Sequence, residues 1–179
     1  DQSLLLMPPS LRPESLFGFH LPGFGTILTL VIIFVTGLIT QNFIGNRLLR
    51  LWELLLQRRA AGKYHSEGLW TNTCCSHPYP GESTPDAARR RVREEMGLNI
   101  IPVFSHSFVY KGHLDNGLTE FEYDHVFTAS TDQNPDPDPT EASEWKYITM
   151  ADLREDVRNN PDAYTLWLKI ILDDPRFGF

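Results

Sequence analysis

Cysteine is scarce in this chain of 179 residues, which contains only Cys74 and Cys75, side by side. Adjacent cysteines make a poor disulfide framework and a poor zinc site, so we expect a reducing compartment or one reactive thiol instead. Basic residues are in the minority, because the net charge is −7, and this balance argues against a general nucleic-acid binder. Internal repeats are absent, and the first residue is not methionine, as expected of a fragment or a processed chain.

Charged side chains are missing between Glu14 and Arg47. The apolar core of this stretch, 21–40, is about long enough to cross a bilayer as a helix, which would give the chain a membrane contact. Its Val, Ile, Phe and Thr content, interrupted by glycine, suits a buried pair of strands instead, and an error of frame or assembly is a third interpretation. We therefore separate an atypical N-terminal segment, 1–52, from a domain that covers 53–179.

In the remainder of the chain, the sequence pattern is typical of a mixed α/β protein. We expect strands at 54–57, 100–110, 119–129 and 144–149, extended chain at 70–77, and helices at 82–96, 149–159 and 161–173. Ser83 and Pro85 mark the start of the first helix, and Gly97 marks its end. Thr149 can cap the second helix. Strands interleaved with helices predict an α/β or α+β sandwich rather than a helical bundle.

The extended stretch 71–77 carries the two cysteines and a histidine. Successive side chains of a strand point to opposite faces, so Cys75 and His77 would share one face and Cys74 would lie on the other. A thiol beside an imidazole suits a nucleophile or an acid next to a metal ligand. Two buried cysteines with an incidental histidine are the other interpretation, and these residues alone favour it.

The same alternation gathers three carboxylates on one face of the strand at 119–129, at Glu120, Glu122 and Asp124. Like charges in one place repel each other, and burial increases the cost. Such a face needs a cation, a shared proton or open water. With His77, a divalent metal is a reasonable hypothesis.

The end of the helix at 82–96 is crowded with arginine and glutamate. Arg90–Glu94 and Arg91–Glu95 have the i, i+4 spacing of weak ion pairs on a solvated helix face, which would be the ordinary interpretation. However, the run 81–98 resembles the Nudix box, a glycine–glutamate loop that leads into a helix ending Arg-Glu-x-x-Glu-Glu-x-Gly. Two positions depart from that pattern: Ser76 replaces the usual first glycine, and Arg91 replaces a metal-binding glutamate of the hydrolases.

The departure at Arg91 is typical of one branch of that superfamily. The stretch from Leu54 to Asp173 is similar to type I isopentenyl-diphosphate isomerases, chiefly through Thr-Asn-x-x-Cys-x-His-Pro at 71–78. This resemblance implies a Nudix-type α/β fold, in which helices sandwich a mixed β-sheet. It also implies interconversion of isopentenyl and dimethylallyl diphosphate in isoprenoid biosynthesis, by protonation of an alkene and removal of another proton.

The resemblance further implies roles for individual residues. Cys75 and Glu122 would be the catalytic pair, acting from opposite sides of the substrate, and Tyr110 would orient or assist the glutamate. The positions that contact the diphosphate and form an aromatic wall fall on Arg59, Lys63, Arg91, Trp70 and Trp167, with Tyr164 as a further aromatic candidate.

Two metal ions are implied in the same way. Glu95, with the backbone at Cys75, would hold a substrate-linked Mg²⁺. His77, Glu120 and Glu122 would belong to a second site for Mn²⁺ or Zn²⁺. Two further histidines of that second site belong upstream of Leu54, where the only histidine is His20 and its spacing differs.

Two other functions stay open beside the isomerase. One is a Nudix hydrolase of a nucleoside or prenyl diphosphate, supported by Glu94 and Glu95 and opposed by Arg91. The other is a truncated or membrane-tethered homologue that binds a prenyl diphosphate without turnover. We expect a monomer that acts on a small molecule in the cytoplasm, or a membrane-anchored form with a cytoplasmic catalytic domain.

Overall fold

The computed structural model describes residues 20–21, 25–26, 28–44, 47–114 and 117–178. At the N-terminal end of this part, β1 (His20–Leu21) and β2 (Gly25–Thr26) form a small antiparallel pair. A long strand, β3 (Leu28–Ile44), then pairs antiparallel with β4 (Arg47–Arg59). The stretch 28–40 is therefore strand rather than membrane helix, whereas 22–24 and 27 lie outside the described residues. Among the described residues, none of the helices combines the length and the apolarity needed to pass through a membrane.

The main sheet has seven strands in mixed orientation. Besides β3 and β4 it contains β5 (Trp70–Thr71), β6 (Cys74–Ser76), β7 (Val103–His113), β8 (Thr119–Thr131) and β9 (Ala142–Thr149). Its order is β5-β4-β3-β8-β7, with β6 added to β3 and β9 to β4. The pair β3–β8 is parallel and the other pairs are antiparallel. The expected boundary at residue 52 falls inside β4, so β3 and the first part of β4, which belong to the N-terminal segment, share this sheet.

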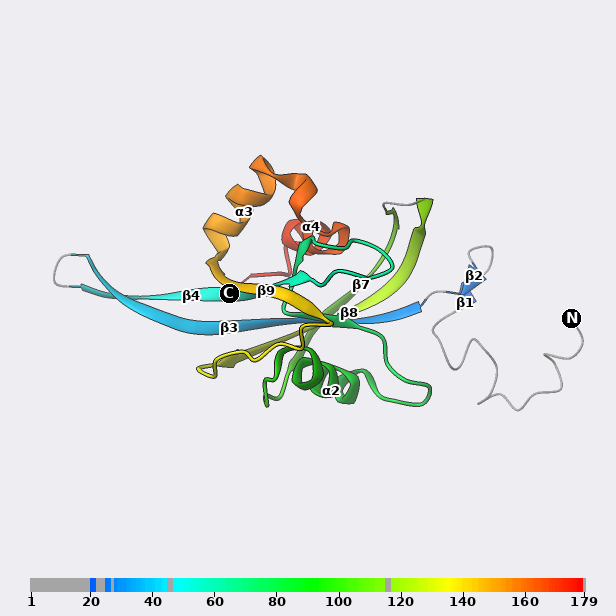
Figure 1. Ribbon diagram of the computed structural model, residues 1–179, viewed down its shortest axis with the longest axis horizontal. Coiled ribbons are helices and arrows are strands. Elements are labelled where there is room, and N and C mark those ends of the chain that lie inside the picture. The colour runs from blue at the N-terminus through cyan, green and yellow to red at the C-terminus, as the bar shows by residue number, and fades with distance from the viewer. Residues whose placement is uncertain (1–19, 22–24, 27, 45–46, 115–116, 179) are drawn as a thin grey trace, which may run out of the picture.

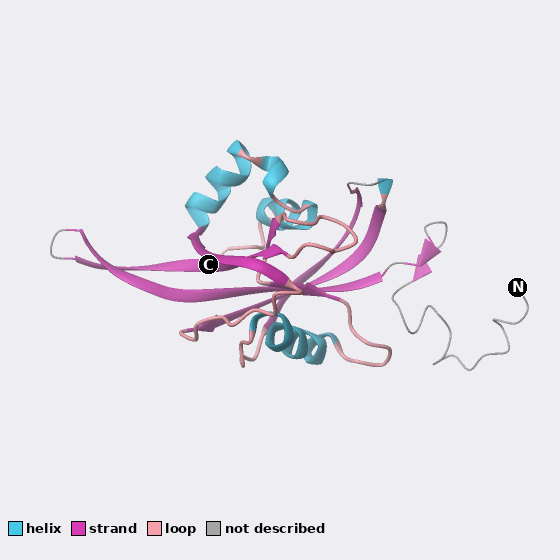
Figure 2. Ribbon diagram, viewed as in Figure 1, coloured by secondary structure: helices cyan, strands magenta, loops and turns pink. Residues whose placement is uncertain are grey.

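Helices cover both faces of the sheet, as Figures 1 and 2 show. The helix α2 (Thr84–Met96) lies on one face, and α3 (Met150–Asn159) and α4 (Leu166–Asp173) lie on the other. The predicted mixed sheet between helices is thus confirmed.

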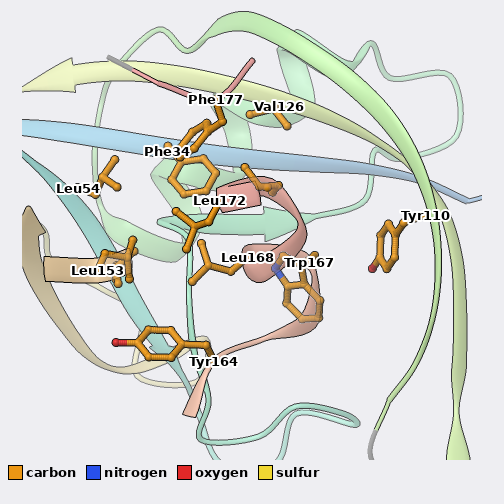
Figure 3. Close-up of a cluster of buried hydrophobic side chains, with 12 residues drawn as sticks. Phe34, Leu54, Tyr110, Val126, Leu153, Tyr164, Trp167, Leu168, Leu172 and Phe177 are labelled. Atoms are coloured by element: carbon orange, nitrogen blue, oxygen red, sulfur yellow. The ribbon is translucent and has the colours of Figure 1, made fainter. Parts of the chain in front are cut away.

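Because both faces are covered, neighbouring residues of a strand enter different cores. Leu54 and Leu56 pack with Trp167 of α4, whereas Leu55 packs with Val92 of α2. Figure 3 shows the first of these clusters, with α4 at its centre. The two buried layers fix the register of the strands, because a slip by one residue would exchange the faces.

The helix boundaries follow the signals in the sequence. Ser83 Oγ accepts a hydrogen bond from Asp86 N, and Thr149 Oγ1 accepts one from Asp152 N, so both predicted caps are present. Gly97 ends α2 with a left-handed φ of 68°, as a C-terminal glycine does.

The predicted continuous helix at 161–173 is wrong. Pro161–Ala163 form a single 3₁₀ turn, η4, and α4 begins only at Leu166. Between them the backbone is extended, because Thr165 N donates to Trp70 O at 3.0 Å and Tyr164 forms a bridge with Trp70. Pairing with β5 therefore outweighs the helical pattern, and Tyr164 is not on α4.

Candidate active site

A pocket of about 190 Å³ lies beside the sheet, between elements that are distant in the sequence. This volume is below the roughly 300–1,000 Å³ of sites for drug-sized ligands, so the pocket suits a small substrate. Its lining combines a thiol, aromatic and imidazole rings, three cationic side chains and three carboxylates. The lining residues are Arg59, Lys63, Tyr64, His65, Cys75, Ser76, His77, Arg91, Glu120, Glu122, Glu141 and Trp167.

Strand register brings the two predicted catalytic residues to one face. Cys75 pairs with Ile32 of β3, and Ile32 pairs with Val126 of β8. Glu122 lies four residues before Val126, and an even separation keeps it on the same face. Tyr110 of β7 pairs directly with Glu122. Cys75 and Glu122 both line the pocket, as the alternation predicts.

The two cysteines lie on opposite sides of the sheet. Cys74 is fully buried in the cluster under α2, whereas Cys75 packs against the α4 cluster and is partly exposed to the pocket. Burial raises the pKa of the Cys75 thiol well above its usual value, Arg59 opposes this shift, and Asp124 and Glu122 add to it. The thiol therefore keeps its proton at neutral pH.

The three carboxylates of β8 are poorly compensated. Glu122 is 4% and Asp124 0% exposed. Neither Glu122 Oε2 nor the two Asp124 oxygens have a hydrogen-bond partner among the described residues. Burial raises the pKa of Asp124 to about 9, with further contributions from Glu122 and Glu120. The repulsion predicted from the sequence is thus present.

Neighbouring side chains hold the remaining carboxylate oxygens. Tyr110 Oη donates to Glu120 Oε2, and His65 Nε2 lies 3.4 Å from Glu120 Oε1. His77 Nε2 lies 3.2 Å from Glu122 Oε1. Tyr110 is itself outside the pocket lining, so its direct contact is with Glu120 rather than with the space for a substrate.

A divalent ion requires several oxygen or nitrogen donors that converge on one point. Among the described residues, no group of three or more His, Cys, Asp or Glu is arranged as a metal cage. The donor types nevertheless fit a cation, because buried carboxylate oxygens without partners remain at Glu122 and Asp124 beside His77. His20, the only upstream histidine, lies in β1, and its side chain is outside the described part.

Arg59 supplies a buried positive charge with free hydrogen-bonding capacity. It is 7% exposed, and its Nη2 donates to His65 O at 3.2 Å. Its guanidinium carbon lies 5.4 Å from the centre of the Trp167 ring. Arg59 Nε has no hydrogen-bond partner in the described part of the chain, as expected of a donor that meets an anionic ligand.

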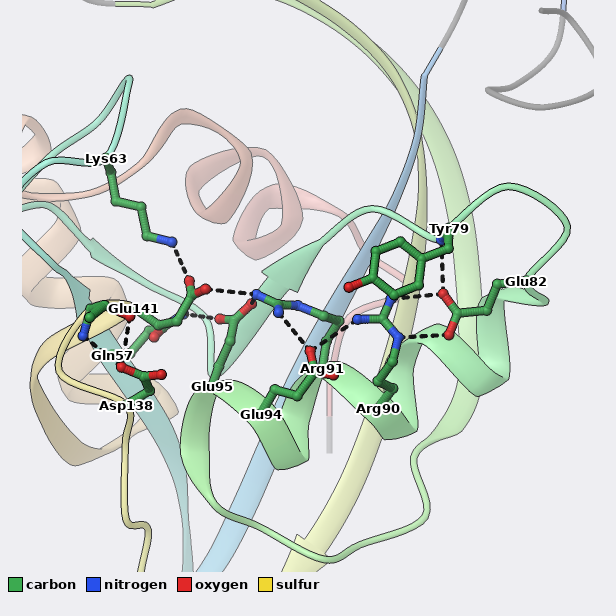
Figure 4. Close-up of polar contacts among 11 residues, drawn as sticks. Gln57, Lys63, Tyr79, Glu82, Arg90, Arg91, Glu94, Glu95, Asp138 and Glu141 are labelled. Atoms are coloured by element: carbon green, nitrogen blue, oxygen red, sulfur yellow. Dashed lines mark hydrogen bonds and ion pairs between the residues drawn. The ribbon is translucent and has the colours of Figure 1, made fainter.

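Lys63 and Arg91 face the same pocket but are paired with carboxylates (Figure 4). Glu141 accepts from Lys63 Nζ and, at 3.1 Å, from Arg91 Nη2. Arg91 also donates to Glu94 and Glu95, each at 2.7 Å. Glu95 is buried behind Arg91, where Gln57 donates to it at 3.0 Å, and it does not belong to the pocket lining.

Arg90 connects α2 to the loop before it, also in Figure 4. Its guanidinium donates two hydrogen bonds of 2.7 Å to Glu82 and one of 3.0 Å to Glu94. Glu82 in turn accepts from Tyr79 N at 2.8 Å, and Arg90 lies over the Tyr79 ring. The predicted Arg90–Glu94 and Arg91–Glu95 pairs are present, but the surface-pair interpretation misses these contacts beyond the helix.

Trp167 is the aromatic candidate that reaches the pocket. Its Nε1 donates to Asn72 Oδ1 at 3.0 Å, and Asn72 Nδ2 donates to the carbonyl of Cys74 at 2.5 Å. Trp70 lies outside the lining with Lys146 over its ring, and Tyr164 donates to Asp156 at 2.5 Å. The structure therefore does not bring these two aromatic rings into the pocket.

Sequence reasoning does not identify four of the lining residues, Tyr64, His65, Ser76 and Glu141. Tyr64 and His65 directly follow the predicted Lys63, so their place in that loop was a usable signal. Glu141 had none, because its partners are 50 and 78 positions away in the chain.

Comparison with known proteins identifies the family. The model of the NUDIX domain matches residues 46–168. In solved structures, the NUDIX domain of Shewanella oneidensis NrtR shares the fold with a TM-score of 0.57 at 16% identity, over 76% of this chain and 82% of that one. The MutT protein of Methanosarcina mazei has a TM-score of 0.55 at 16% identity, over 71% and 80% of the two chains.

Curated relatives are much more similar in sequence. Isopentenyl-diphosphate Delta-isomerase 2 of Aromatoleum aromaticum is 53% identical over 120 residues, which are 67% of this chain and 64% of that protein. Isopentenyl-diphosphate Delta-isomerase 1 of the same organism is 52% identical, over 67% of this chain and 68% of its own. The match thus spans slightly under two thirds of the first relative and slightly over two thirds of the second. The chain belongs to the Nudix family, within its group of isopentenyl-diphosphate Delta-isomerases.

Proposed function

We propose that this chain interconverts isopentenyl and dimethylallyl diphosphate. The observation that carries the proposal is one small pocket in which the Cys75 thiol and the Glu122 carboxyl accompany three cationic side chains. A hydrolase needs neither a thiol nor an aromatic wall, and Arg91 stands in place of a metal-binding glutamate. The names of the curated relatives support the same activity.

The reaction moves a double bond by exchanging protons at two carbons. One catalytic group gives a proton to the terminal alkene carbon, which leaves a tertiary cation, and the other removes a proton from the carbon next to the diphosphate-bearing one. In the reverse direction the two groups exchange roles. Cys75 and Glu122 are suited to this because they come from different strands and line one pocket.

Other lining residues would protect and anchor the substrate. The Trp167 ring offers a π face to the cation, and its burial helps to exclude water. Arg59, Lys63 and Arg91 would bind the diphosphate, which suits the fork geometry of arginine and the point charge of lysine.

Divalent ions complete the proposal. Glu95, once released from Arg91, and the backbone at Cys75 would hold a Mg²⁺ that offsets the charge of the diphosphate. His77, Glu120 and Glu122 would hold a second ion, Mn²⁺ or Zn²⁺, and its positive charge would compensate the carboxylates. We further propose that the protein acts as a monomer in the cytoplasm on this small molecule and does not bind nucleic acid.

The direct test offers isopentenyl diphosphate with Mg²⁺ and follows dimethylallyl diphosphate by chromatography and free phosphate by colorimetry. We expect isomer without phosphate. Release of phosphate without isomer would favour a hydrolase, and binding without either product would favour an inactive homologue.

The adjacent cysteines provide a matched pair of variants for the same assay. Cys75→Ala should reduce kcat by at least about a thousandfold, because one of the two groups that exchange protons with the substrate is lost. Cys74→Ala should leave kcat within a few-fold of wild type, because that thiol faces α2. Equal loss in the two variants would contradict the assignment of Cys75.

A further inference from the structure

Glu141 occupies the position in which a diphosphate would meet two of its cationic ligands. It directly precedes β9, and its carboxylate accepts from Lys63 on the loop after β4 and from Arg91 on α2 (Figure 4). All three side chains line the pocket. Glu141 is therefore in direct competition with any anion that binds Lys63 and Arg91.

This contact is stronger than an ordinary surface ion pair. The side chains of Lys63, Glu141 and Arg91 are 25%, 22% and 17% exposed, so water screens them only partly. Although burial opposes ionisation, hydrogen bonds from Lys63 and Arg91 lower the pKa of Glu141, so the carboxylate is charged at neutral pH.

Lys63 and Arg91 are both paired without a ligand. Glu141 contacts both cations, and Glu94 and Glu95 also accept hydrogen bonds from Arg91. A diphosphate without metal would bring several negative charges to two cations that already have carboxylate partners. A diphosphate that carries Mg²⁺ is less negative, and Mg²⁺ favours carboxylate oxygens as ligands or close neighbours.

We propose that Glu141 makes this pocket select metal-bound over metal-free diphosphate, by neutralising Lys63 and Arg91 until a divalent cation accompanies the anion. The inference rests on the proposed function, because it assumes that the same pocket takes a diphosphate. It adds a selectivity role for a residue that does not take part in proton transfer.

The test measures the binding of inorganic pyrophosphate by titration calorimetry, in EDTA and in excess Mg²⁺. Wild type should bind the magnesium complex more tightly. Glu141→Gln keeps the size of the side chain and removes its charge, so binding of metal-free pyrophosphate should tighten about tenfold. The preference for the magnesium complex should fall by at least the same factor.

Glu144→Gln is the matched control. Glu144 lies three residues after Glu141, on β9, and pairs with Arg58 at 2.7 Å, but its side chain is 54% exposed and lies outside the pocket. Its substitution should leave the preference at the wild-type value. Glu141→Asp retains the charge and should keep most of the wild-type preference. It therefore separates the effect of the lost charge from a folding defect in Glu141→Gln.

Three results would overturn the inference: an unchanged preference in Glu141→Gln, an equal loss of affinity with and without Mg²⁺, or the same change in Glu144→Gln. Because pyrophosphate binding requires no turnover, the outcome is separate from isomerase activity. A protein with the expected preference but no isomerisation would sustain this inference and contradict the proposed function.

Discussion

At the scale of single residues, Gly97 shows how one backbone conformation fixes the end of an element. Its φ of 68° lies in the left-handed region, and an added Cβ would lie 2.6 Å from the carbonyl oxygen of Asp136. Asp136 N donates to Met96 O at 2.9 Å, so that backbone cannot move away without losing a hydrogen bond. The glycine therefore ends α2, and its lack of a Cβ allows the acidic loop to pack directly against it.

We expect Gly97→Ala to lower the free energy of unfolding by about 1–3 kcal/mol, measured by urea denaturation. Gly81→Ala is the control, because Gly81 has a similar φ of 81° with nothing within 4 Å of the added Cβ. A smaller loss in Gly81→Ala would isolate the clash with Asp136. Equal losses would show that only the backbone conformation matters.

Asn72 connects two parts of the pocket wall, the helix α4 and the strand β6. It accepts from Trp167 Nε1 and donates to the carbonyls of Cys74 and Ile33, all in buried surroundings. One amide thus fixes the indole ring and the strand that carries Cys75.

Asn72→Ala should destabilise the protein by about 1–3 kcal/mol for each buried group that it leaves unpaired. Residual enzyme should show a lower kcat, since the indole and the thiol lose their common support, whereas the affinity for pyrophosphate should change little. Thermal unfolding, steady-state kinetics and calorimetry measure the three effects. A loss confined to pyrophosphate affinity would contradict this role.

At the scale of elements, the C-terminal segment after α4 closes one core. Phe177 is 3% exposed and packs against Phe34, with ring centres 4.4 Å apart and ring planes tilted by 46°. The turn before it is held by Asp174, which accepts from the Arg176 guanidinium and backbone. The hydrogen bond from the Arg176 side chain is the main reason that the pKa of Asp174 falls to about 2.

A carboxyl group whose pKa is lower in the folded state stabilises the fold above its unfolded pKa of about 4, and this contribution disappears as the pH falls towards 2. We expect Asp174→Asn to lower stability at pH 6 by at most about 1 kcal/mol, because the Arg176 side chain is 52% exposed and water screens the pair. The difference from wild type should vanish near pH 2. Burial lowers the pKa of His106, which lies 3.8 Å from Asp174, so the comparison is repeated with His106→Gln in both proteins. A difference that persists at pH 2, in acid unfolding followed by circular dichroism, would exclude an ionic origin.

Much of the element pattern could be predicted from local signals. The caps at Ser83 and Thr149, the end at Gly97, and the opposite faces of Cys74 and Cys75 follow from turn chemistry and strand alternation. The break at Tyr164 could not, because the partner that extends it, Trp70, is distant in the sequence. Glu141 was missed for the same reason, since neither of its ion pairs is local.

At the scale of the whole molecule, the fold concentrates three poorly compensated carboxyl groups at one place. Glu120, Glu122 and Asp124 lie on the face of β8 that also carries Val126 of the α4 cluster, and Glu122 and Asp124 are buried there. Buried carboxylates without partners are costly unless a cation or a proton neutralises them. Stability of the whole sheet should therefore depend on divalent ions.

We expect Mn²⁺ or Zn²⁺, at about a hundredfold excess over its dissociation constant, to stabilise the protein by about 2.7 kcal/mol relative to EDTA. For a chain of this size that corresponds to a rise in Tm of roughly 5–10 °C, measurable by scanning calorimetry. Glu122→Gln should lose most of this rise, because it removes a buried ligand charge next to His77. Glu67→Gln, at an exposed position of the loop after β4, should retain it. If Glu122→Gln responded to metal as wild type does, the ion would bind elsewhere, and the carboxylates of β8 would have to be neutralised by protons instead.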